Sequence, residues 1–299
     1  VVNGKAQTLD GELVGEVRLN VPGPREDVYP DFDKQNSAAL FQGRTGYIRI
    51  ADPKGEGDAK DSVLDFRKGD SITIEAWVSA HGINDNQQIY IIGKGRTGGS
   101  GAMAVNQNWA LRLRGVGGAA GVSFLFRGDG KQADSEANWH RWTSEAKIYP
   151  GRGWHHVAVT YTFGKGDSVR GYIDGKPVTG TWDMGGKTDA GPVVDDDEIW
   201  IGSSLGGSPN STFLGSIDEV AVYRTVLSPK RIAERFEKIP GEEDKGNTPL
   251  VDAASLPDGK VRVEIVEGIP SDRSWVFPMP RETEQFELPS FAFAGMPSK

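Results

Sequence analysis

The stretch that decides the fold is GWHHVAVTY at residues 153–161, followed shortly by YIDGKPV at 172–178. Apolar and polar residues alternate with a period of two, and the Asp-Gly pair at 174–175 is typical of a two-residue hairpin turn. A companion segment, IWIG at 199–202, precedes FLGSIDEVAVY at 213–223. This pattern predicts antiparallel strands in a two-sheet sandwich and argues against a nucleotide-binding α/β fold.

Segments of the same kind recur along the chain, with little helical pattern between them. In residues 71–79, Ile72 and Ile74 fall on one face of the expected strand, and Thr73, Glu75 and Trp77 fall on the other. A tryptophan on the nominally polar face indicates that both faces are covered there. We therefore expect an all-β fold, a two-sheet antiparallel jelly-roll sandwich. Its other strands are predicted at 38–41, 47–50, 88–92, 109–113, 122–127, 154–163, 169–173, 198–202 and 216–223.

One short helix and two flanking regions complete the predicted organisation. Ser228 can cap a helix whose first turn holds Pro229, and this helix closes the main domain. We assign residues 1–240 to the sandwich, with an irregular lead-in at 1–35 because proline and glycine break its pattern. After a charged stretch, residues 241–299 are predicted to form a C-terminal extension that is partly docked on the sandwich. A start at Val1 suggests a segment cut from a longer protein.

Composition argues against several function classes. The formal net charge is −8, which disfavours a nucleic-acid partner because phosphate binding relies on clustered lysine and arginine. The sequence contains no apolar run long enough for a membrane span, which needs about 18 residues or more. It has no cysteine, which excludes disulfides, thiolate zinc sites and covalent haem attachment within this segment.

Motifs with catalytic potential have simpler explanations. GKGRTG at 93–98 matches a dinucleotide pattern, but a glycine-rich stretch and a strand follow it where a helix is needed. His155 and His156 are neighbours in a strand, point to opposite faces and are expected to be structural. Glycoside hydrolysis needs two carboxylates across a cleft, and the acidic runs at 195–198 and 282–287 are expected to be solvated surface. An enzyme is therefore the least favoured class.

Aromatic residues offer a possible platform for sugars, because their faces stack on the apolar faces of sugar rings. Packing in the core is the alternative role for the same residues. We select Trp139, Trp142 and Trp182 as candidate carbohydrate-binding residues, since the WHRW segment at 139–142 lies outside a clear alternating strand.

The chain resembles the laminin-G-like, concanavalin-A-like jelly-roll domains over about residues 38–237. The matching segments are LFQG at 40–43, ITIEAWV at 72–78, GWHHVAVT at 153–160, YIDGK at 172–176 and GSIDEVAVY at 215–223. Members of this family include sugar binders, adhesion modules, enzyme appendages and structural domains. Related β-glucanases hold a structural calcium with an aspartate of the last long strand and a glycine carbonyl. Asp218 and Gly43 correspond to these ligands. The Glu-x-Asp-x-x-Glu motif of those glucanases is absent.

The tail at 259–275 resembles segments of planctomycete multidomain proteins in which a laminin-G-like domain lies beside c-type cytochrome segments. This resemblance implies an extracytoplasmic insert domain that contacts neighbouring domains of its parent protein. The resulting expectation is a non-catalytic recognition module that binds a polysaccharide or another glycan. The alternative is a structural or protein-protein interaction domain.

Overall fold

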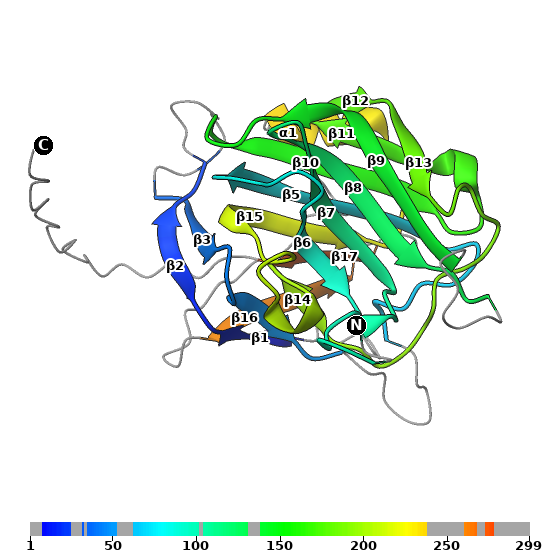
Figure 1. The fold of residues 1–299 in the computed structure, drawn as a ribbon, viewed down its shortest axis with the longest axis horizontal. Helices are drawn as coiled ribbons and strands as arrows, with labels where there is room; N and C mark the ends of the chain where they lie inside the picture. Colours follow the sequence, from blue (N-terminus) through cyan, green and yellow to red (C-terminus); the bar gives the residue numbers. More distant parts are fainter. Residues whose placement is uncertain are drawn as a thin grey trace, which may run out of the picture.

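Two antiparallel sheets face each other across one large hydrophobic core in the computed structural model (Figure 1). The structure describes residues 8–24, 32, 35–52, 62–101, 104–130, 138–237, 260–267 and 273–277. The sandwich architecture predicted from the alternating segments is confirmed. The number of strands was underestimated: the described residues contain seventeen strands, whereas the sequence predicted about ten.

The first sheet has the strand order β2-β3-β15-β5-β10-β11-β12. Its strands are β2 (Val17–Pro22), β3 (Ser37–Gln42), β15 (Leu214–Tyr223), β5 (Ser71–Ala80), β10 (His155–Thr162), β11 (Arg170–Ile173) and β12 (Lys176–Val178). The second sheet has the order β1-β4-β14-β6-β7-β8-β9-β13. Its strands are β1 (Thr8–Val14), β4 (Tyr47–Ile50), β14 (Ile199–Ile201), β6 (Gln88–Lys94), β7 (Trp109–Val116), β8 (Ala119–Arg127), β9 (Trp139–Ile148) and β13 (Gly180–Met184).

Both flanking regions contribute strands to these sheets. β16 (Lys260–Glu267) pairs with β1, and β17 (Arg273–Phe277) pairs with β16 and with the end of β15. The irregular lead-in predicted for 1–35 was wrong over β1 and β2. β2 carries the signal of a strand, since Val17, Leu19 and Val21 alternate with Arg18 and Asn20; the proline and glycine at 22–24 end this strand and do not make the segment before them irregular. The domain boundary at residue 240 stays a prediction.

The face of β5 opposite the main core is covered as well. Trp77 is only 2% exposed; its ring meets Phe32 edge-on at 5.2 Å and stacks on Phe236 at 5.6 Å. Phe236 belongs to α1 (Pro229–Glu237), which begins where the sequence predicts, with the Ser228 hydroxyl accepting a hydrogen bond from the Arg231 N–H at 3.1 Å. The expectation that both faces of this strand are buried is confirmed.

A buried ionic cluster ties α1 to the first sheet, and we call it the Glu75 clamp. Glu75 is 1% exposed, accepts a hydrogen bond from the Tyr223 hydroxyl at 2.9 Å and pairs with Arg235 of α1. His156 Nε2 lies 3.3 Å from its second oxygen. Burial alone would raise the pKa of Glu75, but the Arg235 charge and the hydrogen bonds from His156 and Tyr223 outweigh it and lower the pKa to about 2.

The part of the chain that the structure describes has no helix with the length and apolar character that a membrane crossing requires.

Candidate ligand-binding site

The outward face of the second sheet carries a row of arginines. In β7, Trp109, Leu111 and Leu113 point into the core, so the period of two places Arg112 and Arg114 on the opposite face. The neighbouring strands β8 and β9 continue this face with Ser123, which lies across from both Arg112 and Thr143. The alternation that builds the core therefore also builds a polar, cationic surface on the other side.

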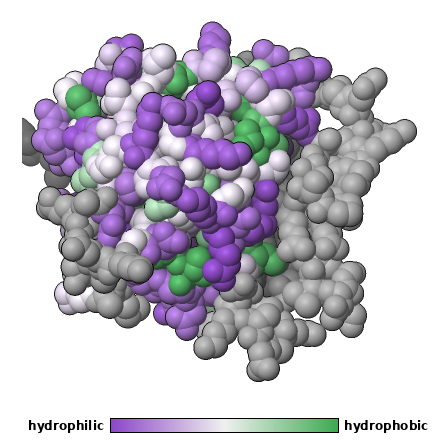
Figure 2. Space-filling view, turned by 90° about the vertical axis from the view of Figure 1, so that its right-hand side faces the viewer, coloured by the Kyte–Doolittle hydropathy of each residue, from purple (hydrophilic) through white to green (hydrophobic). Residues whose placement is uncertain are grey.

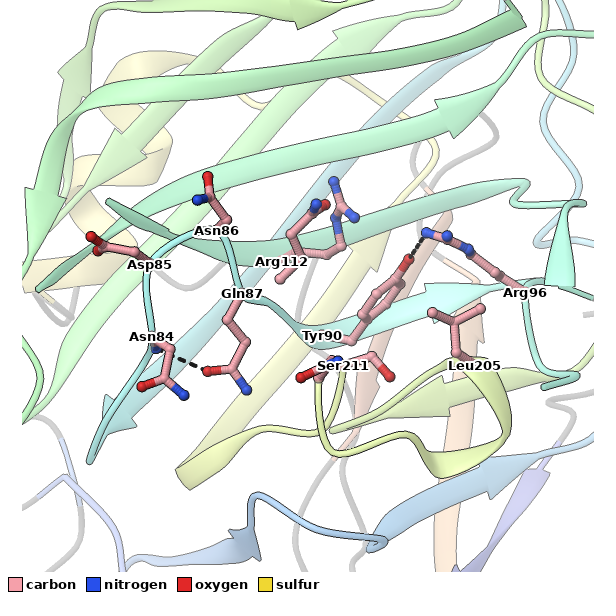
Figure 3. A pocket seen from close by; sticks show the side chains of 11 residues that line it. Asn84, Asp85, Asn86, Gln87, Tyr90, Arg96, Arg112, Leu205 and Ser211 are labelled. Atoms are coloured by element: carbon pink, nitrogen blue, oxygen red, sulfur yellow. Dashed lines mark hydrogen bonds between the residues drawn. The ribbon is translucent and has the colours of Figure 1, made fainter. Parts of the chain in front are cut away.

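A pocket of about 330 Å³ opens at one edge of this face, between β6, β7 and two loops (Figure 3). Its walls combine amide side chains, two arginines, one tyrosine and one leucine. The lining residues are Asn84, Asp85, Asn86, Gln87, Gln88, Tyr90, Arg96, Arg112, Leu205, Asn210 and Ser211.

Close backbone packing fixes the first wall of the pocket. A Cβ added at Gly115 of β7 would lie 1.9 Å from the Asn84 carbonyl oxygen, so only glycine permits the 84–88 loop to lie against this strand. Gln87 then links the two walls: its Oε1 accepts the Asn84 N–H at 2.9 Å, and its Nε2 donates to the Pro209 carbonyl at 3.1 Å. These contacts make the pocket preformed, so its shape does not depend on a bound ligand.

The floor of the pocket is a hydrogen-bonded chain centred on Tyr90. Its hydroxyl donates to Gln107 Oε1 at 2.9 Å and accepts from Arg96 Nη1 at 3.2 Å, and Figure 3 shows this second bond. Arg96 Nε also donates to the Ala104 carbonyl at 3.1 Å. The Arg112 guanidinium lies 5.3 Å from the centre of the Tyr90 ring and donates to the Ser123 hydroxyl at 3.3 Å.

Positive charge dominates the electrostatics of this floor. Burial would raise the pKa of Tyr90, but Arg96 and Arg112 reverse the effect and lower that pKa. Burial is the main cause that lowers the pKa of Arg112 to about 10. The charges of Arg96 and Arg141 lower this pKa further, whereas Tyr90 raises it. Next to the pocket, Arg141 and Arg114 share the single carboxylate of Asp183, at 2.6 and 3.0 Å. The surface is locally cationic in a chain of net charge −8.

The three predicted tryptophans have different environments. Trp142 is 3% exposed, and a Cβ at Gly171 or Gly180 would come within 2.3 Å of its ring, so it is a core residue. The expectation that residues 139–142 lie outside a regular strand is wrong, because they begin β9. Trp182 is half-buried, and its Nε1 donates to the Gly166 carbonyl at 2.9 Å while its ring closes the edge of the core.

Trp139 lies closest to the pocket of the three. The Arg96 guanidinium, which lines the pocket, stacks over the Trp139 ring at 4.9 Å. The structure therefore does not bring the three tryptophans together on one platform. A carbohydrate contact by any of them stays a prediction.

The two adjacent histidines point to opposite faces, as the strand geometry predicts. His155 Nδ1 lies 2.9 Å from Asp174 Oδ2, whereas His156 belongs to the Glu75 clamp. Asp174 and Gly175 both have positive φ, 50° and 71°, and form the tight turn that the Asp-Gly pair predicts. Across the described residues, no group of three or more histidine, aspartate or glutamate side chains is arranged to hold a metal ion.

The calcium prediction fits Asp218 better than Gly43. Gly43 donates its N–H to the Phe213 carbonyl, and Asp218 lies five residues farther along β15, about 16 Å away, so the two residues do not surround one point. At Asp218, its Oδ2 and the Pro24 carbonyl both approach the Asn36 amide nitrogen, at 2.7 and 3.2 Å. Rotation of that amide would add a third hard oxygen of the kind that calcium prefers. Calcium at Asp218 stays a prediction.

Exposed apolar residues do not form a broad patch on the face seen in Figure 2, where hydrophobic colour occurs as small, separate spots among hydrophilic residues. The described large hydrophobic residues that are exposed are Tyr149, Met184, Leu214 and Val226. This surface is suited to polar ligands.

Residues 29–233 match the family described as the concanavalin A-like lectin/glucanases superfamily, in its laminin G form. The match covers well over half of the 299 residues. The chain belongs to this superfamily. The resemblance expected from the jelly-roll segments is thereby confirmed, and the superfamily's name covers both binding proteins and enzymes.

The chain matches only a small part of the curated relatives' length. A segment of 116 residues is 34% identical to a rat protein, the "Sushi, von Willebrand factor type A, EGF and pentraxin domain-containing protein 1", and 33% identical to its mouse counterpart. The similarity covers 37% of this chain and 3% of either relative.

Two solved structures are among those similar to this chain. The binding domain of Paraclostridial Mosquitocidal Protein 1 has a TM-score of 0.49 at 15% identity, over 76% of this chain and 47% of that one. The CBM40 module of a Ruminococcus gnavus IT-sialidase, solved with alpha2,6 sialyllactose, has a TM-score of 0.41 at 17% identity, over 61% of this chain and 90% of that one.

Sequence reasoning missed the arginines of the pocket, although a signal was present. Arg112 and Arg114 alternate with Leu111 and Leu113, in and just after the strand predicted at 109–113, which puts two cations on one face of a β-sheet. Arg96 was noticed only as part of a glycine-rich pattern. No local signal connects it with Arg112, because the two meet through the pairing of β6 with β7.

Proposed function

We propose that this domain is a non-catalytic recognition module whose pocket beside Tyr90 binds a saccharide. The observation that carries the proposal is the lining: five amide side chains surround an aromatic floor in a preformed hollow of about 330 Å³. Amide groups offer a donor and an acceptor side by side, as neighbouring sugar hydroxyls require. The volume lies at the lower end of the range for small-molecule sites, about 300 to 1,000 Å³.

The preformed walls support a binding role. Gly115 and Gln87 hold the 84–88 loop in place, so little ordering is needed when a ligand enters. A site that is already ordered binds more tightly, because less conformational entropy is lost on association.

A non-catalytic role is favoured by the chemistry of the lining. Hydrolysis of a glycosidic bond commonly uses two carboxylates about 5 to 10 Å apart. Among the described residues that line the pocket, Asp85 is the one carboxylate, and its Oδ1 accepts a hydrogen bond from the Gly118 N–H at 3.2 Å. The nearby Asp183 is engaged by Arg114 and Arg141.

The first experiment is a glycan array with the purified chain, followed by calorimetry on each glycan retained. Gln88→Ala and Asn210→Ala should each weaken binding about 3- to 10-fold, the effect of losing one hydrogen bond. Gln42→Ala is the matched control, because Gln42 is an exposed amide on the first sheet. Equal effects of Gln88→Ala and Gln42→Ala would contradict the location of the site.

The wider setting of the domain is part of the same proposal. An extracytoplasmic multidomain parent protein would present the pocket to polysaccharides and bring neighbouring domains into contact with the sandwich. The alternative role as a protein-protein interaction domain would be favoured if the chain bound no glycan on the array and associated stably with flanking segments of the parent protein.

A further inference from the structure

We infer that the saccharide bound in this pocket is acidic, and that Arg96, with Arg112 packed on the ring of the same Tyr90, receives a carboxylate or sulfate group of the ligand. The inference rests on the proposed function and narrows it to a ligand class.

Arg112 is the first line of support. It is 1% exposed, lines the pocket, and its Nε has no hydrogen-bond partner. Its described contacts are neutral, the Ser123 hydroxyl and the face of Tyr90, and no described carboxylate forms an ion pair with it. A buried cation is costly unless an opposite charge compensates it. An anionic group in the pocket would supply that compensation.

Arg96 is placed to make the direct contact. It is more exposed than Arg112, and three contacts orient its guanidinium: the Tyr90 hydroxyl, the Ala104 carbonyl and the Trp139 ring. Arginine offers a planar fork of donors that matches the oxygens of a carboxylate or a sulfate. A fork held in one orientation loses little entropy when such a group binds.

The surroundings strengthen the attraction for an anion. Arg114 and Arg141 lie on the same sheet face and share one carboxylate, that of Asp183. The lowered pKa of Tyr90 reports the same positive potential at the floor of the pocket. The carboxylate of Asp85, on the exposed loop at the rim of the pocket, partly offsets this positive potential. A neutral saccharide could accept hydrogen bonds from these arginines but would gain no ion pairing, whereas an acidic one would also be attracted and oriented by their charge.

The test uses an array of matched pairs: uronic acid oligosaccharides with their methyl esters, sialylated with desialylated glycans, and sulfated with desulfated ones. The acidic member of at least one pair should bind about tenfold tighter or more than its neutral partner. The identity of that pair distinguishes a carboxylate from a sulfate ligand. Its affinity should fall as NaCl rises, because salt screens the attraction.

Two variants of equal charge complete the test. Arg96→Gln should weaken binding of the acidic member about tenfold and leave its neutral partner within about twofold. The control Arg170→Gln removes the same charge from the first sheet, where Arg170 also donates to backbone carbonyls, and should change neither. Pairs that bind equally well, or equal effects of the two variants, overturn this inference and leave the proposed function standing. Failure of every glycan to bind refutes both.

Discussion

Replacement of Glu75 by glutamine should destabilise the fold strongly at neutral pH and weakly in acid. The variant keeps the size of the side chain but removes the charge that faces Arg235 and His156. In the folded protein the pKa of Glu75 falls from an ordinary 4.5 to about 2. Each pH unit of that interval corresponds to about 1.4 kcal/mol, so the ionised carboxylate contributes about 3 kcal/mol to the free energy of unfolding at pH 7.

The sign follows from the direction of the pKa change. A carboxyl group with a depressed pKa in the folded state stabilises the fold above its unfolded pKa of 4.5, and this contribution is lost as the pH falls toward 2. The difference in stability between the native chain and Glu75→Gln should therefore shrink from about 3 kcal/mol at pH 7 to about 1 kcal/mol at pH 3. Loss of one partner from a buried ionic pair commonly costs about 3 to 5 kcal/mol, which agrees with the larger value.

Urea denaturation at pH 7, 5 and 3, followed by tryptophan fluorescence, measures these differences. Glu145→Gln is the matched control, since Glu145 is exposed and bonds to the Thr179 hydroxyl at the surface. It should change stability by less than about 0.5 kcal/mol at each pH. A loss below about 1 kcal/mol for Glu75→Gln at pH 7, or a loss independent of pH, would refute the role assigned to the Glu75 clamp.

Two further predictions concern carboxylates elsewhere. If calcium binds where Asp218 and the Pro24 carbonyl approach Asn36, EDTA should lower the melting temperature of the native chain. The Asn36→Ala variant should no longer respond to EDTA. A melting temperature of the native chain that EDTA does not change would contradict calcium binding at this position. Burial, with the nearby charge of Asp195, raises the pKa of Asp197 to about 7, so this group costs stability as the pH rises from 3.8 through 7. Asp197→Asn should accordingly raise the melting temperature more at pH 8 than at pH 4, and a constant difference would contradict this.

The fold could be predicted because its information is local. Alternation in β5, β10 and β15, the Asp174-Gly175 turn and the Ser228 cap each follow from residues that are close in sequence. β1 has a weaker local signal, because Gly11 interrupts its alternation and its pairing with β4 and β16 depends on distant segments. β2 does carry a local signal, since Val17, Leu19 and Val21 alternate with polar residues.

The site could not be predicted in the same way, because three distant segments build it. The 84–88 loop, Arg112 and the 205–211 loop become neighbours only through strand pairing. Trp142 was misjudged for a related reason. Its burial depends on Gly171 and Gly180, which leave room for its ring from strands that follow it in sequence.

The pairing of β1 with β16 sets an order of events for a chain emerging from the ribosome. Thr8 faces Glu264 in that ladder, and β17 joins β15 beside it. The edge of β1 therefore has no β16 to pair with until Lys260–Glu264, far downstream in the sequence, have been synthesised, and closing so long a loop is slow. An unpaired edge is a template for association with other chains during that interval. A gene truncated at the helix would make this interval permanent, which predicts aggregation for that shorter product.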